Sequence, residues 1–285
     1  MIPAPNPYAD INRITFQPEG FWRVYEVTIR VEEGQQEDVL RFKQEIKCLE
    51  ATDDGHYIFE TKRDPVGMND GQASDNPASS MAEDCGNVLY PLQIKVNAEG
   101  RVVQIHNHEV IKQRWTELKP KLAAYYVGDI AEGYIGRTEN TILDATAFKQ
   151  MIRNDIFMNL FFAPLYRRYE RARPQQLDIP FPVIAGIEPL LYSVSLQLKT
   201  ERDDQQPGIV VEQNGNHTDD ETAADNVNTF SEGSMKASYH LHPRHFYIEE
   251  AEGRWTITDG TGRHSVTATL INIDDYSVPY QDNKN

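Results

Sequence analysis

The sequence YHLHPRH places three histidines, His240, His242 and His245, within six residues. On a β-strand, side chains two residues apart project to the same face, so the first two imidazoles can converge on one ion. A turn after His242 can bring His245 toward the same ion. This spacing raises the hypothesis of a site for a divalent transition metal. The alternative is that Tyr239 and Leu241 face the core and the histidines form the polar face of a strand.

The His-x-His pair, followed by a glutamate, resembles the first motif of the cupin family. In that motif a glycine precedes the pair and the glutamate follows within a few residues. Here Gly233 lies one residue further upstream than the motif has its glycine, and Glu249 lies further downstream than its glutamate. The resemblance implies a metal held by His240, His242, Glu249 and His264.

The familiar sequence signatures of several enzyme classes are absent. There is no G-x-x-x-x-G-K-[ST] phosphate loop, G-x-G-x-x-G fingerprint, G-x-S-x-G elbow or C-x-x-C pair. His108 and Glu109 begin like H-E-x-x-H, but Lys112 stands where the second zinc ligand would be. The sequence therefore names no catalytic residue and no cofactor besides the alternative metal. It leans away from an enzyme without excluding one.

A second candidate site combines an aromatic helix with a cluster of arginines. Its residues are Phe157, Phe161, Phe162, Tyr166, Arg167, Arg168 and Arg171. The aromatic stretch is apolar almost all round the expected helix, which indicates burial in the core, a partner surface or an apolar ligand cavity. The arginines, together with Arg153 and Arg173, can pair with the acidic segment 200–233. They can also bind an anionic ligand or partner, or form the solvated outer face of a helix.

The fold must position these residues, and the spacing of apolar residues, which indicates that fold, changes along the chain. Alternation typical of strands covers about residues 12–106, helical spacing about 107–173, and alternation again about 190–275. Residues 64–84 show no periodicity and predict a surface loop. Pro120 predicts a kink or a break in the first helix. A second helix is expected from about Asp144, with Pro164 bending or ending it and a short helical continuation over 165–173.

Strands, then helices, then strands, with short turns between the strands, favour an α+β fold. We expect a mostly antiparallel β-sheet, curved or partly closed as a barrel, from the N- and C-terminal strand clusters, with the central helices packed on it. We expect one domain over residues 1–285, with an acidic excursion at about 200–233. A two-domain split near 175–190 stays open, as does the question of one sheet or two.

The composition describes an acidic globular chain of 285 residues with a formal net charge of −16. This charge argues against nucleic acid as a partner, because binding its backbone needs a positive field. No apolar stretch approaches the roughly 20 residues of a spanning helix, and the N-terminus has no secretory pattern, so we expect a cytoplasmic protein. Cys48 and Cys85 are then expected as reduced thiols, although an exported protein could join them in one disulfide.

Together these patterns predict a noncatalytic binding protein whose partner is another protein. It would serve as an accessory subunit of an assembly or as an acidic inhibitor of the immunity type. Two alternatives stay open. One is a metal-dependent enzyme or metal-binding protein that uses His240 and His242, and the other is a carrier of a small apolar ligand held between helices and sheet. The sequence does not decide the oligomeric state.

Overall fold

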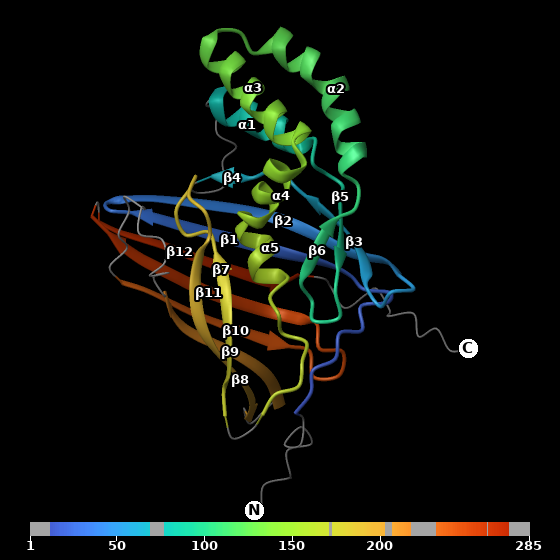
Figure 1. Cartoon of the computed structure of the whole chain (residues 1–285), viewed down its shortest axis with the longest axis vertical. Helices are drawn as coiled ribbons and strands as arrows, with labels where there is room; N and C mark the ends of the chain where they lie inside the picture. Colours follow the sequence, from blue (N-terminus) through green and yellow to red (C-terminus); the bar gives the residue numbers. More distant parts are fainter. Residues whose placement is uncertain are drawn as a thin grey trace, which may run out of the picture.

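A computed structural model describes residues 12–68, 77–170, 173–202, 207–217, 232–260 and 262–273 (Figure 1). The strands are β1 (Trp22–Glu33), β2 (Gln36–Ala51), β3 (Tyr57–Arg63), β4 (Gly67–Met68), β5 (Leu92–Val96), β6 (Val102–Ile105), β7 (Gln175–Phe181), β8 (Leu190–Arg202), β9 (Pro207–His217), β10 (Glu232–Leu241), β11 (Ile248–Asp259) and β12 (Gly262–Asn272). The helices are α1 (Pro77–Asn87), α2 (His108–Tyr125), α3 (Asp129–Leu143), α4 (Ala145–Arg153) and α5 (Ile156–Phe161).

The strands form one antiparallel sheet in the order β6-β5-β3-β2-β1-β12-β11-β10-β9-β8-β7, with β4 paired to β2. The two strand clusters meet where β1 pairs with β12, with Val27 opposite Leu270. This confirms the mostly antiparallel sheet with helices, and it shows that the clusters share a single sheet. Among the described strands, β6 pairs only with β5 and β7 only with β8, so the sheet is open along the seam between these two edges.

The core lies on one face of this sheet. Tyr25 and Val27 of β1 are buried at every second position, because successive strand side chains point to opposite faces. Helix α5 packs on the same face, where the ring of Phe161 lies 5.2 Å from that of Tyr25 and the ring of Phe162 lies 5.7 Å from that of Phe59. The sheet curves round this helix, and its two edges lie on either side of α4 and α5 (Figure 1).

Helices α1, α2 and α3 pack against one another and project from one end of the sheet (Figure 1). The break that Pro120 predicts does not occur, because α2 continues to Tyr125. Pro120 and Thr116, whose carbonyl loses its usual partner, are both exposed, so water can satisfy that carbonyl. In the described part of the chain, no helix is long and apolar enough to cross a membrane.

Three helical boundaries differ from the expectation. Part of the loop expected over 64–84 folds as β4 and α1. The single helix expected from Asp144 is two helices, because Asp155 starts α5 by accepting a hydrogen bond from the Met158 amide at 2.9 Å. The described part of 165–173 is not helical, and its backbone instead forms a β-bridge between Arg168 and Arg13.

The strands after the helices begin earlier than the sequence pattern indicates. β7 precedes the expected start at about 190, although Pro180 lies within it. An edge strand tolerates proline because one of its sides has no ladder to donate to. The acidic segment 200–233 contains the end of β8, all of β9 and the first residues of β10, while 203–206 and 218–231 lie outside the described residues.

Candidate ligand-binding site

The side chains of His240, His242 and His245 do not converge on a common position for a metal ion. β10 ends at Leu241, so His240 lies exposed on the strand and His242 begins a turn. The Nδ1 atom of His242 accepts hydrogen bonds from the backbone amides of His245 at 3.1 Å and Arg244 at 3.3 Å. The His242 and His245 rings stack with their centroids 4.9 Å apart. Burial, and then the neighbouring cationic groups, lower the pKa of His242.

His264 lies far from this turn. Along β11, His240 is opposite Glu250 and His264 is opposite Ile257, a separation of seven residues or roughly 23 Å. The Nε2 atom of His264 is instead 3.3 Å from the carboxylate of Asp259. In the described residues, no cluster of three or more histidine, cysteine or acidic side chains is placed to hold a metal. The ligand set that the cupin resemblance implies is therefore not assembled. A metal on the other histidines stays a prediction for elemental analysis of untagged protein.

The aromatic part of the second candidate site belongs to the core. Phe157, Phe161 and Phe162 are all buried, and α5 carries the first two into the sheet face. The half-buried ring of Tyr166 lies 4.3 Å from that of Phe16. Of the three interpretations, burial describes Phe157. Phe161 also lines a small cavity of about 20 Å³ together with Tyr166, and Phe162 reaches both the core and a cleft described below.

The described arginines of that site do not form one surface. The Nη2 atom of Arg167 lies 3.1 Å from the Glu99 carboxylate, and Arg168 is exposed. Arg171 lies outside the described residues. Arg153, at the end of α4, belongs to the same arginine cluster and lines the same cleft as Phe162.

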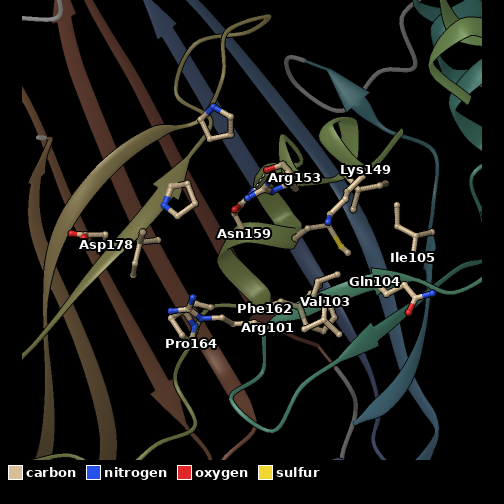
Figure 2. Close-up of a pocket in the computed structure, with 17 residues that line it drawn as sticks. Arg101, Val103, Gln104, Ile105, Lys149, Arg153, Asn159, Phe162, Pro164 and Asp178 are labelled. Carbon is tan, nitrogen blue, oxygen red and sulfur yellow. Dashed lines mark hydrogen bonds between the residues drawn. The ribbon is translucent and has the colours of Figure 1, made fainter. Parts of the chain in front are cut away.

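A cleft of about 300 Å³ opens at the seam of the sheet, and we call it the seam cleft (Figure 2). Edge strands β6 and β7 form its two walls, and α4, α5 and the residues after α5 lie between them. Its apolar lining consists of Val102, Val103, Ile105, Ile152, Met158, Phe162, Ala163, Pro164, Ile179, Pro180 and Pro189. Its polar lining consists of Arg101, Gln104, Lys149, Arg153, Asn159 and Asp178.

Local capping positions the helical side of the seam cleft. Asp144 begins α4 by accepting hydrogen bonds from two backbone amides at 2.7 and 2.8 Å. Lys149 and Arg153 are four positions apart, so both lie on the same face of α4. The side-chain amide of Asn159 donates to the backbone carbonyls of Arg153 at 2.6 Å and Asp155 at 2.8 Å. This bond pair fixes the end of α4 against α5.

The electrostatics of the seam cleft contrast with those of the whole chain. Three basic side chains and one acidic side chain line it, in a protein whose formal net charge is −16. Figure 2 shows the carboxylate of Asp178, on the β7 wall, directed away from the basic side chains. The site can therefore bury an apolar group and offer a positive charge beside it.

Periodicity and motif analysis missed most of this site. Arg101, Val103, Lys149 and Asp178 carry no motif, and they come from segments that meet only when the sheet curls. Arg153 and Phe162 were among the candidate residues, but for a surface that the structure does not form. The proline in β7 was the available signal, since it is typical of an unpaired edge.

Comparisons with known proteins give no family. No family model matches the chain, and no curated protein matches it. A solved structure that concerns lipid–protein interactions in lipovitellin is similar over 93% of this chain and 26% of that chain, with 11% identity and a TM-score of 0.47. This chain thus spans about a quarter of the length of that one.

Proposed function

We propose that this protein binds and carries a small, largely apolar molecule in the seam cleft. The observation that carries this proposal is the cleft itself, an opening of about 300 Å³ between two unpaired strand edges with an apolar floor. This volume lies at the lower end of the range for small-molecule sites, which are mostly apolar with a few placed polar groups. The sequence raised this role as an alternative, a carrier of a small apolar ligand held between helices and sheet.

The cleft is pre-formed because its floor belongs to the core. Phe162 is 6% exposed and its ring packs 4.8 Å from that of Phe161, while Met158 and Ile152 are each 7% exposed. A ligand that buries about 200 Å² of apolar surface there would gain roughly 5 kcal/mol before the entropic costs of association. The protein would not need to rearrange its core to bind.

A blocked cleft tests this function. Val103 is 42% exposed on the β6 wall, so Val103→Trp should fill the cleft without disturbing the core. Val110, 47% exposed on α2 and outside the cleft lining, provides the matched control Val110→Trp. We expect native mass spectrometry of protein from its native cell to show a copurified small molecule in the wild type and the control, and its loss in Val103→Trp. A ligand that persists in Val103→Trp would refute the location.

A second candidate function is the protein-binding role expected from the sequence, and one observation favours it. Tyr125, Val127 and Ile130 are 78%, 81% and 84% exposed where α2 meets α3, and we call them the hairpin tip. The tip projects away from the sheet (Figure 1), and contiguous exposed apolar residues are typical of interaction surfaces. The cytoplasm stays the proposed compartment, and the free, buried thiols of Cys48 and Cys85 agree with it.

A bait experiment tests the hairpin tip. Tyr125→Ser/Ile130→Ser should lose a stoichiometric partner that the wild type retains from a native extract. Val110→Ser/Leu143→Ser removes two apolar side chains of 47% and 48% exposure from the same helices, away from the tip. This control should keep the partner. Failure of the wild type to retain any stoichiometric protein would count against the role.

A further inference from the structure

We infer that the ligand of the seam cleft carries an anionic head, a carboxylate or a phosphate, held by Arg101, Lys149 and Arg153. The inference rests on the proposed function, because it names the ligand class for the same cleft. These three cations come from the turn before β6 and from α4, and all of them line the cleft. Lys149 and Arg153 are exposed where they line the cleft, so a charged group of a ligand can reach them.

The two cations of α4 lack acidic partners. Within the described part of the chain, neither Lys149 nor Arg153 has a carboxylate within 4.0 Å, and the nearby Glu188 carboxylate instead accepts from Gln150 at 2.6 Å. Like charges four residues apart on a helix repel each other. The dipole of α4 favours Arg153 in its last turn but does not explain Lys149 one turn earlier. A bound anion would relieve the repulsion between the two.

Arg101 presents a buried donor without an acceptor. Its Nε atom is buried and makes no hydrogen bond. The closest carboxylate, that of Glu99, lies 3.9 Å from this Nε and closer to Arg167, at 3.1 Å from Nη2. A buried N–H group without an acceptor is costly, and a carboxylate or phosphate oxygen is a strong acceptor. Arg101 therefore brings to the cleft lining a guanidinium that the Glu99 carboxylate does not fully satisfy.

The arrangement also orients the ligand. In Figure 2, Arg153 and Lys149 lie on the α4 side of the cleft, Arg101 lies beyond Asn159, and Asp178 stands on the opposite wall with its carboxylate directed outward. The anionic head would lie among the three cations, and the apolar body would run over Phe162 toward the β7 wall. Carboxylates and phosphates share this recognition chemistry.

Eight-carbon probes with and without a charged head distinguish the contribution of the charge to the binding affinity from that of the apolar chain. A cleft of about 300 Å³ calls for small probes, and we choose octanoate, octyl phosphate and 1-octanol. By isothermal titration calorimetry, we expect at least one of the two anions to bind the wild type about tenfold more tightly than 1-octanol. Lys149→Met/Arg153→Met should remove most of that advantage, since only Arg101 remains, and leave the affinity for 1-octanol unchanged. Higher salt should weaken only the anion.

A charge-matched control variant tests whether the effect is specific to the cleft, and the comparison of octanoate with octyl phosphate identifies the anionic group. Lys121→Met/Arg137→Met removes the same charge from exposed residues of α2 and α3, outside the cleft lining, and should bind the anions like the wild type. Stronger binding of octanoate indicates a carboxylate ligand, and stronger binding of octyl phosphate indicates a phosphate. Equal binding of 1-octanol and both anions would overturn the inference and leave the carrier function standing. Equal loss in the control variant would also overturn it. Binding of no probe, with no ligand displaced by Val103→Trp, would overturn the function itself.

Discussion

Replacing Gly253 by alanine should destabilise the wall of the seam cleft from within the core. Gly253 and Trp255 lie two residues apart on β11, so they share a face of the strand. An added Cβ would lie 2.1 Å from Cη2 and 2.5 Å from Cζ3 of Trp255. The indole cannot easily move, because it is 2% exposed and stacks on Phe181 with the ring centroids 3.6 Å apart.

The expected loss of folding stability in Gly253→Ala follows from overpacking of the core. Forcing one extra carbon into a filled core typically costs about 1–3 kcal/mol. For a chain of this size each kcal/mol lowers the melting temperature by roughly 2–4 °C, so a fall of about 2–12 °C is expected. A displaced Trp255 would push on Phe181, the last residue of β7, whose preceding residues line the cleft. Ligand affinity should therefore fall together with stability.

Thermal unfolding followed by circular dichroism measures the first effect, and calorimetric titration of octanoate measures the second. The control is Gly136→Ala in α3, where an added Cβ meets nothing within 4 Å. Alanine in a helix interior should stabilise this control by about 0.5–1 kcal/mol, the opposite sign. A Gly253→Ala variant that melts with or above the wild type would refute the packing described around Trp255.

Two further predictions concern single groups. Asp144→Ala should lower the melting temperature at pH 7, because the amides of Ala147 and Thr146 lower the pKa of the capping carboxyl below its ordinary 3.8. A lowered folded-state pKa gives stability that is present above pH 3.8 and lost as the pH falls through the folded value. The difference between variant and wild type should thus shrink in thermal scans below pH 4. Burial raises the pKa of Cys48 to about 12 and that of Cys85 to about 11, so an aromatic disulfide reagent at pH 8 should label neither thiol in the folded protein and both in urea. Rapid labelling of the folded protein would contradict the burial of these thiols.

The strands could be predicted where burial of one face imposes a local pattern. Buried residues alternate from Tyr25 to Ile29 in β1 and from Phe42 to Cys48 in β2, and Gly34 at the turn between the strands adopts a φ of 61° that favours glycine. The pairing of β1 with β12 could not be predicted in the same way. It joins residues such as Tyr25 and Asn272, and no local period reports which distant strand lies alongside.

Elements that depend on their neighbours were missed. Helix α3 contains Gly133 and Gly136, which weaken its intrinsic helical tendency, and its buried Ala131 and Ile135 gain their stability from packing on the other helices. The histidine hypothesis assumed a strand through His242. β10 instead ends at Leu241, and the Nδ1 atom of His242 accepts hydrogen bonds from amides of its own turn.

The seam cleft exists because the sheet does not close, and the chain places several obstacles at the closing edge. Helix α5 brings Phe162 between the two edges, and Pro180 removes one N–H donor from β7.

The net charge of the chain does not reveal the charge of the cleft. The formal charge of −16 is a sum over the whole chain, whereas Lys149 and Arg153 set the local field in the cleft. An acidic protein can therefore present a positive site, because binding depends on the charges that converge and not on their sum. Lys149 and Arg153, which would select the ligand, are exposed, so the packing of the fold hardly constrains which residues stand there.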